Sequence, residues 1–326
     1  MGDPQGIGLD ITLMAWARRK SLALPPFVLY AEVDATRTRA HALGLDAPLS
    51  ILEDPADATD AFARALPVIP LPADASLDGA STVSAIERAT ADVAAARVRA
   101  LVTNPISKSK PGFERLPYPG HTEFLADLSH RFWGVARPHP VMMLASELLR
   151  VVPVTVHIPL AQVPTALTAD LLATTLAITH AALVSDFGIA APRIAVAGLN
   201  PHAGEAGLIG REDVDLIAPV LDVARSRGMT VAGPLSADTL FHAEARAGYD
   251  AALAMYHDQA LIPIKTLSFD TGVNVTLGLP FVRTSPDHGT AFALAGTGKA
   301  RPHSFVAALR LADEIATRRA AAGRPT

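Results

Sequence analysis

The sequence predicts an α/β protein with a mainly parallel central sheet, and three observations support this class. Short apolar runs alternate with longer helix-like stretches along the whole chain, which is the order of elements in α/β folds. Several of these runs are continuous rather than alternating, as in strands buried on both faces of a sheet. Glycine-containing and polar segments follow several runs, where the loops of an open sheet collect ligands.

The expected strands are short runs rich in apolar residues. The runs at 141–145 and 150–156 are close enough to form a hairpin. In chain order the strands and β-like segments are expected at residues 27–31, 66–71, 100–102, 141–145, 150–156, 193–197, 251–255, 272–278 and 281–285.

The expected helices are longer and carry recognisable end signals. Ser81 or Thr82, Thr122 and Thr168 are candidate N-caps, because a hydroxyl oxygen can accept from an unpaired helix N–H. Glycines follow three of the helices, at 44, 188 and 228. The helices are expected at residues 7–20, 33–43, 81–99, from about 122, 168–187, 212–227 and 304–319.

The composition limits the class of function. The 326 residues suffice for two domains with large cores, and a net charge of −4 gives no reason to expect nucleic acid or an anionic membrane as a partner. The chain has no cysteine, so disulfides, iron–sulfur clusters and thiolate zinc sites are excluded. No signal peptide or membrane-length apolar run is visible, and a cytoplasmic location is expected.

A glycine-rich segment, Gly-Asp-Pro-Gln-Gly-Ile-Gly at residues 2–8, opens the first helix. Such a loop can bring backbone N–H groups to an anion. Its spacing matches neither the dinucleotide fingerprint nor the Walker loop, so a tight turn is an equal alternative. An α/β unit normally opens with a strand and none precedes this loop, so the numbered start is expected to lie inside the first unit.

Three of the eleven histidines, His157, His202 and His257, follow apolar β-like runs and lie beside Pro or Asp. Three imidazoles with one open position are what a catalytic zinc site requires. Their wide separation leaves a second interpretation open, in which they are ordinary core or surface residues. That second interpretation is preferred for His41, His130, His139, His180, His242 and His303.

Lys265, Asn274 and Arg283 form a second set, and each is expected on a separate β-like segment of the C-terminal half. Two cations and a neutral donor suit a phosphate group. Three solvated or salt-bridged surface residues are the alternative.

Together these segments resemble the PdxA family, the 4-hydroxythreonine-4-phosphate dehydrogenases of pyridoxal phosphate biosynthesis. The resemblance covers nearly the whole chain in order. Its motifs lie at residues 2–8, 119–124, 199–205, 254–259, 272–285 and 287–291.

The resemblance implies the two-domain α/β/α fold of the isocitrate and isopropylmalate dehydrogenases, with a mainly parallel sheet and the active site in the interdomain cleft. Residues 1–120 plus 286–326 would form a terminal domain. Residues 121–285 would form a central domain with the dimer interface and most site residues. A homodimer with a site shared between protomers is implied.

The implied activity is an NAD- or NADP-dependent oxidation of a secondary alcohol in 4-hydroxy-L-threonine 4-phosphate. Decarboxylation to 3-amino-2-oxopropyl phosphate would follow. The implied cofactor besides the nicotinamide is a divalent metal, zinc first, with magnesium or cobalt as alternatives.

The resemblance also implies roles for individual residues. Asp238 and Asp258 are candidates for proton transfer or for orienting metal ligands, with structural roles as helix cap and hydrogen-bond partner equally open. The implied metal ligands are His157, His202 and His257; the substrate-binding residues are His121, Thr122, Lys265, Asn274 and Arg283; and the cofactor-binding residues are Gly204, Glu205, Asp287, His288, Gly289 and Thr290.

Two departures and two alternatives accompany the resemblance. The family usually has a short strand before the first glycine loop, and its best-known members have Gly where this chain has Asn104, a variation that the family is expected to tolerate. Paralogous dehydrogenases act on 4-phospho-D-threonate or 4-phospho-D-erythronate, and a more distant relative acts on a dihydrodiol dicarboxylate. A phosphate-binding or phosphotransacetylase-like protein without dehydrogenase activity is the alternative from another class.

Overall fold

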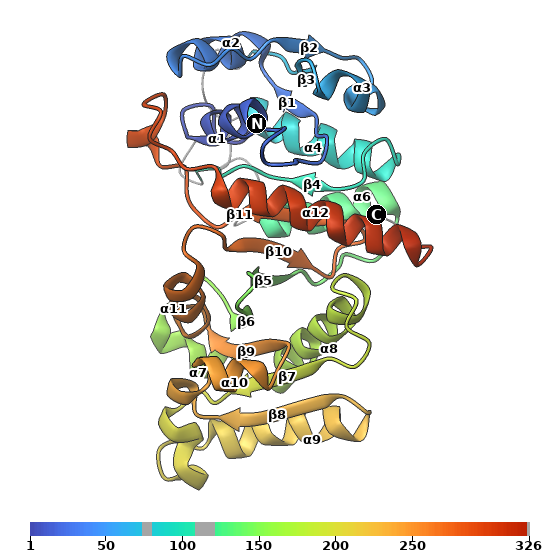
Figure 1. Cartoon of the computed structure of the whole chain (residues 1–326). Helices are drawn as coiled ribbons and strands as arrows, with labels where there is room; N and C mark the ends of the chain where they lie inside the picture. The colour runs from blue at the N-terminus through green and yellow to red at the C-terminus, as the bar shows by residue number, and fades with distance from the viewer. Residues whose placement is uncertain (74–79, 108–120, 325–326) are drawn as a thin grey trace. The chain divides into compact units, whose positions relative to one another are not determined.

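A computed structural model describes residues 1–73, 80–107 and 121–324 of the chain. The chain divides into two compact units (Figure 1). The first unit comprises Met1–Pro140 and Leu279–Thr326, and the second comprises Val141–Gly278. These boundaries differ from the expected ones, because the helix that starts at His121 packs in the core of the first unit through Phe124, Leu125 and Leu128.

The first unit contains two sets of parallel strands. One set is a three-stranded sheet in the order β1-β3-β2, and the other is the pair β4 with β11. The strands are β1 (Leu29–Ala31), β2 (Leu49–Ile51), β3 (Leu66–Pro70), β4 (Leu101–Val102) and β11 (Arg283–Pro286). The helices are α1 (Gly8–Ala17), α2 (Val33–Ala42), α3 (Ala58–Phe62), α4 (Ala80–Ala94), α6 (His121–Trp133) and α12 (His303–Ala321), with short 3₁₀ turns η1 (Pro55–Asp57) and η6 (Phe292–Leu294).

Aromatic side chains fill much of the core of the first unit. Trp16 is 2% exposed and its Nε1 donates to the carbonyl of Phe62 at 3.1 Å. Phe27 packs edge-on against Phe62 and Phe305. The first helix, a short β–α segment and the last helix are therefore joined in one core, which explains how both ends of the chain come to share a unit.

The second unit contains six strands in the order β10-β5-β6-β9-β7-β8. The pairs β10–β5 and β5–β6 are antiparallel, and β6–β9, β9–β7 and β7–β8 are parallel, so the expected hairpin and the mainly parallel character are confirmed. The strands are β5 (Val141–Ala145), β6 (Arg150–Thr155), β7 (Arg193–Ala197), β8 (Thr230–Leu235), β9 (Ala251–Tyr256) and β10 (Val273–Leu277).

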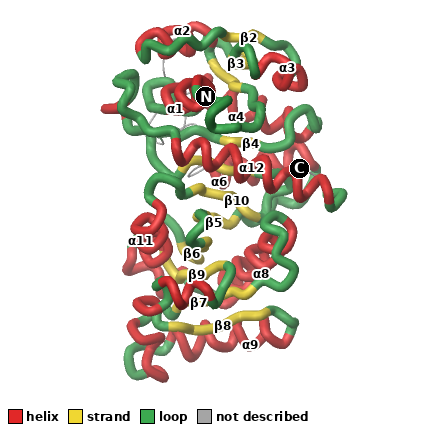
Figure 2. Tube along the Cα trace, viewed as in Figure 1, coloured by secondary structure: helices red, strands yellow, loops and turns green. Residues whose placement is uncertain are grey.

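Helices and short turns flank this sheet (Figure 2). They are α7 (Val163–Ala166), α8 (Ala169–Ser185), α9 (Ala218–Ser226), α10 (Ala243–Ala247) and α11 (His257–Ser268), with the turns η2 (Leu160–Gln162), η3 (Pro201–Gly207), η4 (Asp213–Ile217) and η5 (Ala237–Thr239).

The helix ends test the cap predictions. Thr168 does cap α8, since its hydroxyl accepts from Leu171 N at 3.2 Å. The prediction that Ser81 or Thr82 caps a helix was wrong: both lie inside α4, and Thr82 donates instead to the carbonyl of Gly2 at 2.9 Å. Thr122 likewise lies inside α6.

Among the described residues, no single helix is both long and apolar enough to cross a bilayer. One bent pair of helices, Leu160–Ala166 with Ala169–Ser185, passes that test by length and composition alone.

Candidate metal and substrate site

Two of the three candidate metal ligands lie next to each other at one edge of the sheet in the second unit. His157 follows β6, and His257 follows β9 as the first residue of α11. The two strands are parallel and Thr155 pairs with Tyr256, so the segments that follow the two strands leave the sheet side by side. The ring centroids of His157 and His257 are 5.5 Å apart, with 44° between the ring planes.

This separation suits two ligands of one cation. Imidazole rings that bind one zinc ion at about 2.0–2.1 Å have their centroids about 5 Å apart when the angle at the metal is near tetrahedral. His157 also has a backbone φ of 50°, in the left-handed region that few non-glycine residues adopt. Such strain is concentrated at functional sites.

Asp258 orients the ring of His257. Its Oδ1 lies 2.7 Å from His257 Nδ1. The neutral tautomer that donates through Nδ1–H to this carboxylate leaves the Nε2 lone pair available to a cation, which is a common arrangement around metal-binding histidines.

Gln259 ties this corner to the next loop, a role that the sequence analysis did not assign. Its Oε1 accepts from Met255 N at 2.6 Å, and its Nε2 donates to the carbonyl of Gly198 at 2.8 Å. The end of β9, the start of α11 and the segment after β7 are therefore held by one side chain. The signal for it was its place in the histidine motif at 254–259.

The loop that carries His202 is organised around a buried carboxylate. Asp213 is fully buried and accepts from Leu199 N at 2.8 Å, from Asn200 N at 3.1 Å and from Asn200 Nδ2 at 3.0 Å. Gly198 allows the close approach, since a Cβ there would lie 2.6 Å from Asp213 Oδ1. Within η3, residues 202–206 all have positive φ, so this loop has a left-handed turn.

His202 was expected to lie with the other two histidines, and it does not do so within one copy of the chain. Across residues 1–73, 80–107 and 121–324, no group of three or more His, Cys, Asp or Glu residues could hold a metal ion within one copy of the chain. His202 is exposed in the left-handed turn, as is Glu205, whereas Gly204 is buried there. The structure thus supplies two facing imidazoles and leaves the third proposed ligand apart from them.

The proposed phosphate-binding residues are distributed over both units. In the second unit, Asn274 lies in β10 opposite Leu144, as expected of a β-like segment. The same expectation was wrong for Lys265, which lies in helix α11 with its Nζ 5.9 Å from the centre of the Phe269 ring. In the first unit, Arg283 is buried in β11 and donates to Thr103 Oγ1 at 2.6 and 3.2 Å. Burial lowers the pKa of Arg283 to about 10, which still leaves it a cation at neutral pH.

Other predicted site residues lie at loops and helix ends. Asp238 is exposed in η5. α6 begins at His121, whose side chain lies outside the described residues, as do Pro119 and Gly120 of the same motif. Thr122 is half-buried in the first turn of α6.

The glycine-rich loop and the loop at 287–290 contact each other in the first unit. Ile7 N donates to the carbonyl of Thr290 at 3.0 Å. Asp287 N donates to Ser304 Oγ at 3.0 Å, and His288 Nδ1 lies 3.0 Å from the carbonyl of Gly289. Two motifs nearly three hundred residues apart in sequence are therefore in direct contact.

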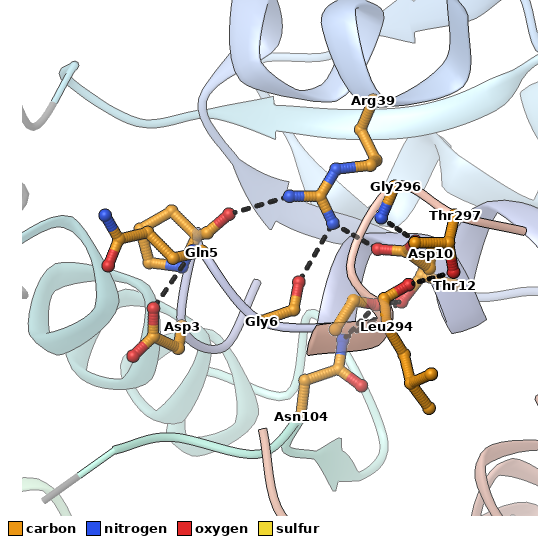
Figure 3. A network of polar contacts seen from close by, with 12 residues as sticks. Asp3, Gln5, Gly6, Asp10, Thr12, Arg39, Asn104, Leu294, Gly296 and Thr297 are labelled. Atoms are coloured by element: carbon orange, nitrogen blue, oxygen red, sulfur yellow. Dashed lines mark hydrogen bonds and ion pairs between the residues drawn. The ribbon is translucent and has the colours of Figure 1, made fainter. Parts of the chain in front are cut away.

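A polar network holds the glycine-rich loop, and Figure 3 shows it. Arg39 donates to the carbonyls of Pro4 at 3.1 Å and Gly6 at 2.9 Å and pairs with the buried Asp10. Asp10 also accepts from Gly296 N at 2.6 Å. The carbonyls on this side of the loop are thus engaged by protein groups.

Asn104 is a second anchor for this loop. Its Nδ2 donates to the carbonyls of Met1 and Gly8, both at 3.2 Å, and to Thr12 Oγ1 at 3.0 Å. The Asn104 side chain therefore has a structural role at the start of the chain. Neither Arg39 nor Asn104 was singled out from the sequence as an anchor, because their partners are main-chain carbonyls remote along the chain.

Comparisons with known proteins show the family to which the chain belongs. The family model described as pyridoxal phosphate biosynthetic protein PdxA matches residues 23–312. A 4-hydroxythreonine-4-phosphate dehydrogenase of Xanthobacter autotrophicus is 53% identical over 324 residues, which cover 97% of this chain and 92% of that relative.

Solved structures extend the likeness to the fold. The 4-hydroxythreonine-4-phosphate dehydrogenase of Klebsiella pneumoniae superposes with a TM-score of 0.82 at 37% identity, covering 97% of this chain and 96% of that one. A terephthalate 1,2-cis-dihydrodiol dehydrogenase from Burkholderia xenovorans superposes less closely, with a TM-score of 0.62 at 29% identity over 96% of each chain.

Proposed function

Because the chain belongs to the PdxA family of pyridoxal phosphate biosynthesis, we propose that it oxidises and decarboxylates 4-hydroxy-L-threonine 4-phosphate with a nicotinamide cofactor. The product would be 3-amino-2-oxopropyl phosphate. The relatives above carry the name of this dehydrogenase. The observation in the chain itself that carries the proposal is the facing pair of His157 and His257 at the ends of two adjacent parallel strands.

We propose that this pair holds a divalent cation, with His202 as the third ligand. The donor chemistry fits, because imidazoles without thiolates suit zinc, and cobalt or magnesium are the alternatives. When bound, the cation supplies positive charge that favours loss of the alcohol proton and stabilises the negative charge that develops as carbon dioxide leaves.

The neighbouring side chains keep the ligands in a binding-competent state. Asp258 accepts from His257 Nδ1 and so keeps the proton off Nε2. Gln259 fixes the backbone of Met255 and Gly198, and therefore the directions in which β9 and the loop after β7 leave the sheet. Asp238 and Asp258 are the candidate proton acceptors, since both carboxylates are exposed and can exchange protons with solvent.

The substrate phosphate would be bound by Lys265, Asn274 and Arg283, with His121 and Thr122 as further contacts. Two cations and an amide donor match a phosphate dianion in charge and donor number. The nicotinamide cofactor, NAD or NADP, would contact Gly204, Glu205 and residues 287–290, the last of which contacts the glycine-rich loop.

We also propose a cytoplasmic homodimer whose protomers share the site. Two large apolar residues in and directly after α11, the helix that His257 opens, support an interface there. Ile262 within the helix and Phe269 at its C-cap expose 65% and 69% of their surface, and neighbouring exposed apolar side chains are typical of subunit contacts.

The test is reduction of NAD and NADP by the purified protein with 4-hydroxythreonine 4-phosphate, beside 4-phospho-D-threonate and 4-phospho-D-erythronate. Each assay is run after chelation and after adding zinc, magnesium or cobalt. The amino substrate is expected to give the highest kcat/KM, and chelation is expected to abolish turnover. A preference for either sugar-acid phosphate would assign a paralogous activity. Metal-independent acyl-phosphate turnover with no reduction of either nucleotide would refute the dehydrogenase proposal.

A further inference from the structure

The strand pair β4–β11 in the first unit brings three polar side chains together near the carboxyl end of β4. The two strands are parallel, with Arg283 beside Leu101. Thr103, directly after β4, donates its N–H to the carbonyl of Thr284 at 3.1 Å, so the same register continues two residues further. Ser285 therefore lies beside Thr103.

One face of this pair carries the three side chains. Side chains of a strand alternate between the two faces of a sheet, which places Thr103, Arg283 and Ser285 on the same face. The other face belongs to α12 (Figure 1), since the hydroxyl of Thr284 donates to the carbonyl of Ala308 in that helix at 2.9 Å. The three polar groups thus share a face that α12 does not cover.

The side chain of Arg283 runs along this face to the hydroxyl of Thr103. Its Nε and Nη2 donate to Thr103 Oγ1 at 3.2 and 2.6 Å. Because Thr103 lies two residues beyond the strand partner of Arg283, the guanidinium extends toward the carboxyl end of β4. Ligands of open α/β sheets bind beyond the carboxyl ends of the strands. A buried cation is therefore aimed at the place where a ligand is expected.

The hydroxyl of Thr103 has a donor that the chain leaves unused in its described part. A threonine hydroxyl offers one O–H donor and two acceptor lone pairs. The two N–H groups of Arg283 occupy the lone pairs, and the O–H donates to no acceptor in residues 1–73, 80–107 and 121–324. Thr103 is 5% exposed, and buried polar groups are almost always hydrogen-bonded. The O–H is thus directed away from the guanidinium, toward an acceptor that remains to be supplied.

Ser285 adds a second hydroxyl of the same kind. It is 7% exposed, and its Oγ makes no hydrogen bond to any other residue that the structure describes. A strand offers a buried serine no carbonyl one turn earlier, the local acceptor that helical serines often use. Two neighbouring hydroxyl donors beside a guanidinium suit an anion with several acceptor oxygens, and the phosphate of a monoester has three.

We propose that Thr103 and Ser285 are phosphate-binding residues, whose hydroxyls donate to the phosphate of the substrate beside the positive charge of Arg283. With hydrogen bonds of about 2.7 Å, a phosphate oxygen bound to Thr103 would lie about 4–5 Å from the two nitrogens that donate to the same hydroxyl. Thr103 thus accepts from the cation and donates to the anion. The inference rests on the proposed function, because it takes Arg283 as a ligand of the substrate phosphate.

The experiment compares the wild-type chain with Thr103→Val, Thr103→Ser and Ser285→Ala. Thr284→Val is the matched control, because it removes a buried hydroxyl from the same strand on the face toward α12. One set of measurements gives kcat and KM for 4-hydroxy-L-threonine 4-phosphate and the KM for NAD. The other gives the rise in Tm that inorganic phosphate causes in the chelated protein, relative to chloride at the same ionic strength. Each variant is its own reference there, so a change in basal stability cancels.

Thr103→Val and Ser285→Ala are each expected to raise the KM for the phosphorylated substrate about tenfold, which corresponds to one hydrogen bond to a charged group. Each is also expected to remove most of the stabilisation by inorganic phosphate. The values of kcat and of the KM for NAD are expected to stay within about twofold, since the lost contact binds substrate and transition state alike. Thr103→Ser and Thr284→Val are expected to behave like the wild type.

A raised KM for NAD with an unchanged KM for the substrate would overturn the proposal, because the bound phosphate would then belong to the cofactor. Equal stabilisation of the wild type and Thr103→Val by inorganic phosphate would also overturn it, as would no stabilisation of the wild type or an equal loss in Thr284→Val. If the wild type reduces no nucleotide with the phosphorylated substrate, the proposed function fails. Loss of the phosphate effect in Thr103→Val and Ser285→Ala would support the binding roles even then.

Discussion

Asp258→Asn is expected to weaken binding of zinc or cobalt about tenfold while leaving the fold intact. The carboxylate contacts His257 Nδ1 at 2.7 Å, and its side chain is 71% exposed. It therefore acts mainly by orienting the ring and by its charge, and it stabilises little of the core.

The size of the effect follows from the geometry. A cation bound to Nε2 at about 2 Å would lie about 6 Å from this carboxylate, where a dication and a single charge attract by about 1.4 kcal/mol in water. That energy corresponds to a factor of about ten in affinity. Loss of a residue that orients a metal ligand usually weakens metal binding by about 10–100-fold. The exposure of Asp258 favours the lower end of that range, which agrees with the factor of about ten from the charge.

Competition of Co²⁺ between the protein and a chromophoric chelator measures the affinity directly. Asp222→Asn is the matched control, because that carboxylate is also exposed, at 74%, and pairs only with its helix neighbour Arg225 among the described residues. An affinity loss below twofold for Asp258→Asn, or an equal loss for Asp222→Asn, would refute the role of Asp258 as the orienting residue.

Three further predictions concern stability. Asp213→Ala is expected to cost about 3–5 kcal/mol in urea unfolding, because three donors lose one buried acceptor and each unmade hydrogen bond costs about 1–3 kcal/mol; a loss below about 1 kcal/mol would contradict this. Asn104→Ala is expected to cost about 1–3 kcal/mol and to speed amide exchange in residues 1–8, with wild-type exchange as the contrary result. Arg193 holds the pKa of Asp250 below its ordinary value of 3.8, so its stabilisation is complete above that pH and is lost as pH falls through the lower folded-state pKa. The Tm difference between wild type and Asp250→Asn should therefore be constant from pH 7 to about 5 and shrink below about 4, and a difference that grows on acidification would contradict the linkage.

The fold could be predicted largely from local pattern. Continuous apolar runs such as 193–197 and 251–255 form buried parallel strands, because burial on both faces leaves no polar alternation. Helix α11 was harder to predict, because His257 follows a strand directly and Pro263 inside the helix interrupts the usual helical pattern. The segment around Lys265 was therefore expected to be β-like, although it is helical.

The residues that hold the glycine-rich loop and the His202 loop in place could not be predicted from local pattern. Arg39 and Asn104 act on carbonyls of the glycine-rich loop, and a main-chain acceptor leaves no mark in side-chain chemistry. Asp213 has the local pattern of an acidic residue near a helix start, yet it is fully buried and accepts from the loop thirteen to fourteen residues earlier. Long-range contacts of this kind are decided by packing, which a single sequence does not display.

The different outcomes for the three histidines follow from their distance to the sheet. A parallel ladder places the ends of neighbouring strands about 4.8 Å apart, and each further residue of loop can move the chain by up to about 3.5 Å. His257 follows β9 immediately and His157 is the second residue after β6, so the register of these two strands nearly determines their meeting. His202 is the fifth residue after β7, within a turn whose direction depends on Asp213 and on left-handed backbone. Its position is therefore set by the loop, and the third ligand is the part of the proposed metal site that strand order alone cannot determine.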